Sequence, residues 1–164
     1  MADFRFHISN LKSEIFNLKS EIFIMSETVP QEFWQGVEQF NQGEFYACHD
    51  TLEALWMEAT QPDKTFYQGI LQIAVALYHL GNKNWRGAVI LLGEGTNRLR
   101  YYQPDYLDIN VEELIAQSSD LLIALQETGA ENIAEFVQYF QKNGTYRGND
   151  GDLPVPKIVK IIED

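Results

Sequence analysis

The chain of 164 residues is long enough for one domain with a sizeable core, because domains of this length bury roughly two thirds of the surface of the unfolded chain. Its hydrophobic fraction of 45% excludes general disorder. A formal charge of -12 opposes the phosphate backbone of nucleic acid, and the basic residues are not gathered into a stripe. We therefore expect no nucleic-acid partner.

The cysteine content and the apolar stretches predict a cytoplasmic protein without a membrane span. The single cysteine, Cys48, cannot form an internal disulfide, which suits a reducing compartment. The longest apolar stretch, residues 70–80, is interrupted by Gln72 and His79 and is shorter than the roughly 20 residues that a span needs. Residues 1–25 carry acids and lack a continuous apolar segment, so they do not resemble a signal peptide.

The beginning of the chain contains a tandem duplication. Residues 10–16 and 17–23 have the same sequence, Asn-Leu-Lys-Ser-Glu-Ile-Phe. Its apolar residues recur at heptad spacing, which is compatible with a short coiled-coil seam, although two heptads are fewer than such seams usually have. The alternative, which we favour, is that a repeated upstream stretch is translated and that Met25 is the working start. Residues 1–28 are therefore expected to form a leader.

The spacing of apolar residues beyond the leader predicts an all-α fold. We expect a compact antiparallel helical bundle over residues 29–142, in which two helical hairpins with short turns are covered by two further helices. The tail, residues 143–164, is rich in glycine, aspartate and proline and is predicted to be a surface loop with a short docked end. The six helices are expected at about residues 28–41, 44–60, 63–80, 84–101, 111–127 and 131–142.

Polar residues gather on two of these helices. An α-helix advances about 100° per residue, so residues four apart, such as His49 and Glu53, lie about 40° apart on one face. By the same arithmetic, polar residues form one line along the most hydrophobic helix, residues 63–80. A short connection makes this helix an antiparallel neighbour of the helix that carries His49, so the two polar lines should face each other. The candidate binding residues on the two lines are His49, Asp50, Glu53, Trp56, Gln68, Gln72 and His79.

This cluster has three interpretations. His49, Glu53 and His79 are candidate catalytic residues for acid–base chemistry or ligands of a divalent metal, although glutamines beside them are poor metal ligands. The cluster is also compatible with a structural hydrogen-bond network that fixes helix register, which is the interpretation we favour. It is also compatible with a small-molecule pocket in which Trp56 supplies an apolar wall. Asp50 lies about 100° from His49, so it either joins the cluster or points outward.

Two other features favour structural roles. Cys48 lies in an apolar helical pattern with acidic neighbours, so we predict a core residue and not a reactive thiol. Gly87-Ala88 and Gly93-x-Gly95 are predicted to allow close contact between helices. They do not form a phosphate-binding loop, because no strand precedes them and no Lys-Ser/Thr pair follows.

The combined pattern of these helices resembles the DUF309 family. The residues that carry the resemblance are Phe45-x3-His49-Asp50-x2-Glu53-x2-Trp56, Gln68-Gly69-x2-Gln72-x-Ala74, His79 and Gly81-Asn82-x4-Gly87-Ala88. The resemblance implies an all-helical domain of bacteria, archaea and plastid-bearing lineages with no established activity. By this resemblance His49, Glu53, Trp56, Gln68 and Gln72 fall on the family's signature. The family usually has glutamate directly after the histidine, where this chain has the shorter Asp50.

The sequence therefore predicts a domain of unknown function with two hypotheses about its activity. The first is a non-enzymatic module whose polar cluster is a structural network or binds a small molecule or a protein partner. The second is a hydrolase in which His49 is the base, Glu53 orients it, and His79 or a metal polarises the substrate. No cofactor is implied, a divalent metal is left open, and the composition permits a homodimer.

Overall fold

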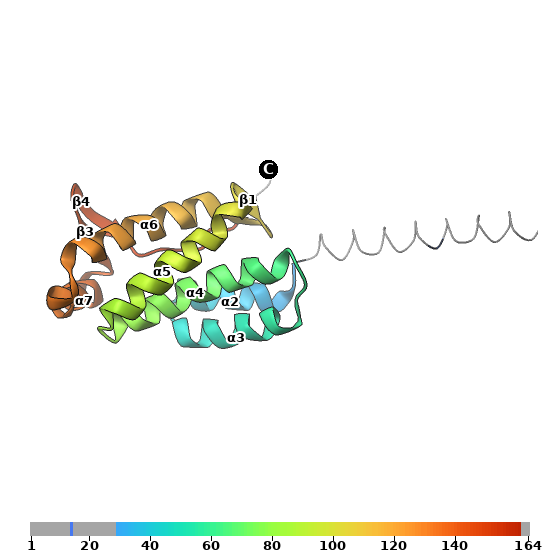
Figure 1. The fold of residues 1–164 in the computed structure, drawn as a ribbon, viewed down its shortest axis with the longest axis horizontal. Helices are drawn as coiled ribbons and strands as arrows, with labels where there is room; N and C mark the ends of the chain where they lie inside the picture. Colours follow the sequence, from blue (N-terminus) through green and yellow to red (C-terminus); the bar gives the residue numbers. More distant parts are fainter. Residues whose placement is uncertain (1–13, 15–28, 162–164) are drawn as a thin grey trace, which may run out of the picture. The chain divides into compact units, whose positions relative to one another are not determined.

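The structure is a computed structural model that describes residues 29–161 and, before them, residue 14. The predicted leader and its duplication lie outside the described residues apart from residue 14. The all-α prediction is confirmed, because helices make up most of the described chain (Figure 1). The helices are α2 (Gln31–Asn41), α3 (Phe45–Glu58), α4 (Asp63–Gly81), α5 (Trp85–Leu99), α6 (Val111–Thr128) and α7 (Ile133–Asn143).

Helix α4 is the centre of the core. Its apolar residues at helical spacing, Phe66, Ile70, Ile73 and Leu77, are all buried. A helix that is hydrophobic over most of its circumference has to be covered on several sides. In Figure 1, α2 and α3 lie on one side of α4, and α5 and α6 lie on the other. The short turns after α2 and after α4 make the two predicted hairpins, α2/α3 and α4/α5.

Helices α4 and α5 approach each other closely through glycines. A Cβ atom added to Gly95 would lie 2.7 Å from the backbone oxygen of Gly69, and one added to Gly69 would lie 2.8 Å from a methyl carbon of Leu99. Both distances are shorter than van der Waals contact. At Gly95 the obstacle is backbone, so glycine is required there, whereas at Gly69 the side chain of Leu99 would have to shift. The prediction of a close helix contact is confirmed for Gly95. Gly93 does not take part, since the nearest atom to its added Cβ is a Leu122 carbon 3.8 Å away.

Helix α6 covers the open side of α5, as predicted. The indole Nε1 of Trp85 donates a hydrogen bond of 2.7 Å to the backbone oxygen of Leu125, which joins the start of α5 to the end of α6. Between α5 and α6 lie a short 3₁₀ turn, η1 (Arg100–Tyr102), and the strand pair β1 (Asp105–Tyr106) and β2 (Ile109–Asn110). A second 3₁₀ turn, η2 (Ala130–Asn132), leads into α7. Among the described helices, none is long and apolar enough to cross a membrane.

The tail differs from the predicted surface loop. Strands β3 (Thr145–Gly148) and β4 (Gly151–Pro154) form an antiparallel hairpin against which α7 packs. The loop prediction was wrong here because Tyr146 is buried and anchors the hairpin, whereas the surrounding glycines and aspartates supply only its turn and edges.

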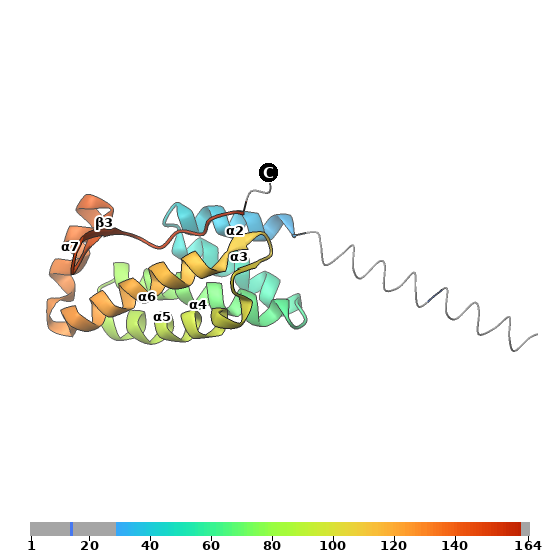
Figure 2. The same ribbon diagram turned by 90° about the horizontal axis from the view of Figure 1, so that it is seen from above.

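The docked end of the tail is confirmed. The side chain of Asn41 on α2 pairs with the backbone of buried Ile158, donating at 2.9 Å and accepting at 2.8 Å. Ile109 and Lys160 form an isolated antiparallel bridge. Figure 2 shows this segment running from the hairpin past α6 to α2. The tail therefore ties the last elements of the chain to the first described helix.

Candidate functional site

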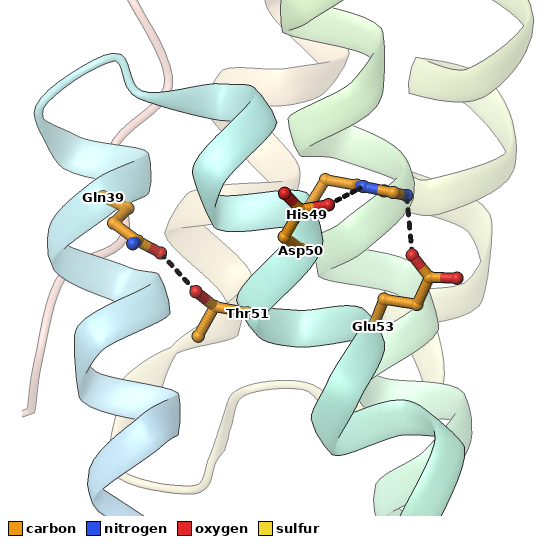
Figure 3. A network of polar contacts seen from close by, with 5 residues as sticks. All are labelled: Gln39, His49, Asp50, Thr51 and Glu53. Atoms are coloured by element: carbon orange, nitrogen blue, oxygen red, sulfur yellow. Dashed lines mark hydrogen bonds and ion pairs between the residues drawn. The ribbon is translucent and has the colours of Figure 1, made fainter.

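Two carboxylates on α3 flank the imidazole of His49. Its Nδ1 lies 3.4 Å from Asp50 Oδ1, and its Nε2 lies 3.5 Å from Glu53 Oε2, one helical turn away (Figure 3). Glu53 therefore lies beside His49 as the helical spacing predicts. The side chain of Asp50 points outward, since it is 62% exposed, and its carboxylate still lies beside the ring of His49 and so joins the cluster. On the opposite side of α3, Thr51 donates a hydrogen bond of 2.7 Å to Gln39 of α2.

The donor set fits a metal ion poorly. One atom each from His49, Asp50 and Glu53 lies within 4.8 Å of the others, which is close enough to consider a shared ion. However, the two carboxylates face opposite nitrogens of the ring. An ion held by one imidazole nitrogen in the ring plane would meet one carboxylate and leave the other on the far side. The arrangement is that of a hydrogen-bonded histidine more than that of a chelating site.

A small hollow opens between α3 and α4 next to this histidine. Its volume is about 190 Å³, and it is largely apolar. It combines residues at spacings of three and four from the two helices, which is how each helix presents one face. The lining residues are Phe45, Tyr46, His49, Val75, Tyr78 and His79. The structure thus brings His49 and His79 to one site, as expected from the short connection between two antiparallel helices.

His79 is held from the other side by α5. Asn84 is the N-cap of α5, and its Oδ1 accepts a hydrogen bond of 3.0 Å from the backbone N–H of Gly87. The amide nitrogen of Asn84 then faces His79 Nδ1 at 3.3 Å. An amide nitrogen can only donate, so Nδ1 accepts, and the neutral ring of His79 carries its proton on Nε2.

Gln72 does not face α3, contrary to the prediction. Its Nε2 donates to Glu94 Oε2 at 3.1 Å, and its Oε1 accepts from Arg98 Nε at 2.9 Å. Both partners lie on α5, one turn apart on either side of Gly95. Helical spacing correctly places Gln72 and His79 on one face, but it does not say which neighbouring helix that face meets. Gln72 is therefore a buried link between α4 and α5.

Trp56, Gln68 and Cys48 lie outside the hollow. Trp56 is half-buried, with Lys64 Nζ 4.5 Å above its ring, and it does not form the apolar wall considered for it. Gln68 is half-buried one turn before Gln72. Cys48 is fully buried, as predicted, and this burial raises the pKa of its thiol to about 12.

The aromatic walls of the hollow were missed in the sequence. Tyr46 and Tyr78 are exposed, and their ring centroids lie 5.4 Å apart. Tyr46 precedes His49 by three residues and Tyr78 follows Val75 by three, so each lies on the face of its helix that lines the hollow. The signal that could have revealed them is that each is a large aromatic residue outside the apolar face of its helix.

Comparisons with known proteins support the family resemblance over one part of the chain. The uncharacterised protein YpuF of Bacillus subtilis (strain 168) is similar to it, with 33% identity over 84 residues. That match covers 51% of this chain and 45% of YpuF, so it spans about half of each protein. Residues 33–91 match the model of DUF309, a domain of unknown function, and the predicted family resemblance is confirmed over this segment.

Proposed function

We propose that this domain is a non-enzymatic binding module whose hollow between α3 and α4 receives one side chain of a partner protein. One observation carries the proposal. Tyr46 and Tyr78, which are 59% and 40% exposed, stand side by side at the edge of an apolar hollow that also contains two histidines. Exposed aromatic residues around a concave surface are typical of interaction sites.

The size of the hollow favours a side chain over a whole small molecule. Pockets for small molecules usually have volumes of about 300–1,000 Å³. A hollow of about 190 Å³ is smaller, and at protein interfaces single anchor residues commonly fill a pocket of their own. A small-molecule ligand, which the sequence left open, would have to extend well beyond the hollow.

The position of the hollow also favours it over two larger hollows beside the β3–β4 hairpin. Those have volumes of about 320 and 360 Å³ and are lined by residues from 120 onward. The hollow between α3 and α4 lies entirely within residues 33–91, the segment that matches the DUF309 model. A function that belongs to the domain is expected within the domain.

The hydrolase alternative has little support. None of the six residues that line the hollow is a serine, threonine or cysteine, the nucleophiles most often activated by a histidine base. Each ring nitrogen of His49 faces a carboxylate, which leaves neither directed at a substrate. Neither the family description nor the name of the relative gives an activity.

The polar contacts around His49 would contribute little to the stability of the fold. Asp50 and Glu53 are 62% and 46% exposed, and ion pairs at such positions contribute at most about 1 kcal/mol to stability. The network that does fix helix register is formed by Gln72, Glu94 and Arg98. The residues around His49 are therefore available for binding.

Site-specific photo-crosslinking in the source cells tests this proposal. A benzophenone amino acid at position 46 of the full chain should give a discrete cross-linked product with another protein. The same probe at position 101, where the native Tyr101 is 87% exposed on η1, should not give that product.

A second substitution checks that the hollow itself is required. Val75→Phe places a larger side chain in the floor of the hollow and should abolish the product while circular dichroism shows an intact fold. If position 46 gives no product beyond that of position 101, or if the product persists in the Val75→Phe chain, the hollow is not the binding site.

A further inference from the structure

We infer that the hollow selects a neutral side chain with an apolar body and a hydrogen-bond acceptor at its tip, as tyrosine has. This inference rests on the proposed function and specifies the chemical class of the group that binds.

The acceptor is required because His79 presents a hydrogen-bond donor. The Cγ–Cδ2 edge of its ring lies against Gly87, where an added Cβ would be 3.0 Å from both atoms, and Nδ1 faces Asn84. The remaining polar atom of the ring, Nε2, has no hydrogen-bond partner among the described residues, and His79 lines the hollow. Since Nδ1 accepts from Asn84, the neutral ring has its N–H at Nε2, and a ligand that lacks an acceptor would leave this donor without a partner.

The charges around the hollow repel an anion, and the N–H donor of His79 disfavours a cation inside it. The chain has a net charge of -12, and the Asp50 and Glu53 carboxylates lie beside the hollow, so an anion would be repelled. A cation would be attracted from a distance, but neither carboxylate lines the hollow, and both are directed at His49. Inside the hollow a guanidinium or ammonium group, which can only donate, would meet the Nε2–H of His79.

The remaining walls require an apolar body. Phe45 and Val75 contribute hydrocarbon, and the rings of Tyr46 and Tyr78 stand at the edge, 5.4 Å apart. Aromatic rings pack well against such walls in offset or edge-to-face geometry. A phenol satisfies both requirements, because its ring packs in the hollow and its oxygen accepts from His79.

The test compares two probes that differ only in the hydroxyl group. The isotope-labelled full chain is titrated with p-cresol and with toluene, and dissociation constants are obtained from amide shifts of the lining residues. The titrations are repeated with His79→Phe, which keeps a ring but removes the donor. The dissociation constant of toluene divided by that of p-cresol should be about three to ten times larger in the wild type than in His79→Phe. The reason is that the substitution removes one net hydrogen bond to p-cresol.

The outcomes separate this inference from the proposed function. Equal ratios in the two chains, or tighter binding of ethylguanidinium than of p-cresol, would overturn the inference while hollow binding itself stands. If neither p-cresol nor toluene shifts the lining residues, the proposed function fails as well. An independent measurement is the ¹⁵N spectrum of the His79 ring at mildly alkaline pH, which should show the proton on Nε2. A proton on Nδ1 would contradict the inference.

Discussion

Burial decides which reactive side chains of this protein are open to chemistry. His49 and Cys48 are neighbours on α3, yet His49 reaches the surface hollow while the Cys48 thiol is completely buried. Burial disfavours the charged thiolate and raises the pKa of Cys48 from 9.0 to about 12. The same cause raises the pKa values of Tyr67 and Tyr146 to about 12. These three groups belong to the core.

The raised pKa of Cys48 predicts a loss of stability at alkaline pH. In the unfolded chain the thiol loses its proton near pH 9, whereas in the folded chain it keeps the proton until about pH 12. The unfolded state then binds fewer protons, so the free energy of unfolding should fall between these values, by about 1.4 kcal/mol per pH unit for this one thiol. Denaturation in urea at several pH values measures the slope.

The control for this prediction is Cys48→Ala. Tyr67 and Tyr146 contribute a fall in the same direction, but from a starting pKa of 10.0, so the thiol dominates just above pH 9. Between pH 9 and 10 the slope should be shallower for Cys48→Ala than for the wild type. Equal slopes would show that the thiol is not protected by burial.

At the level of helices, the contact between α4 and α5 holds the site in place. Gly69 and Gly95 bring the two backbones together, and Gln72 bridges Glu94 and Arg98 across the same contact. At the end of this contact Asn84 and Gly87 hold the ring of His79. The orientation of His79 in the hollow thus depends on the packing of α5, although no residue of α5 lines the hollow.

Two alanine substitutions on α5 should therefore have opposite effects. Gly95→Ala places a carbon 2.7 Å from a backbone oxygen of α4, and the helices must separate, which should lower the free energy of unfolding by about 1–3 kcal/mol. Gly93→Ala meets only a carbon 3.8 Å away and should raise that free energy by up to about 1 kcal/mol, because alanine favours the helix. Chemical denaturation measures both. A Gly95→Ala chain as stable as Gly93→Ala would contradict the close contact.

At the level of the whole molecule, periodicity predicted the helices and the buried faces well. Phe66, Ile70, Ile73 and Leu77 are spaced for a helix and are all in the core. Spacing within one helix could not say which neighbour a polar face meets, and so Gln72 was expected opposite α3. It also could not foresee the β3–β4 hairpin, whose strands are only four residues long and depend on the burial of Tyr146 against the rest of the chain.

Helical spacing also explains why only part of the candidate site was predicted. His49, Glu53 and His79 follow from helical spacing and the short turn between helices. The exposed Tyr46 and Tyr78, which stand at the edge of the hollow, were missed, since their exposure depends on where neighbouring helices end. Asn84 was expected only at the start of a helix, and its contact with His79 depends on the angle between α4 and α5.

Whether ligands bind in the hollow between α3 and α4 can be measured by mapping the binding site on the full chain. Backbone amide shifts of the labelled protein are recorded as p-cresol or toluene is added. For both probes, we expect the largest changes within residues 45–49 and 75–79 on α3 and α4, with little change at the hairpin hollows. Changes centred on residues 120–153 instead, or spread evenly over the surface, would contradict the claim that the hollow between α3 and α4 is the binding site.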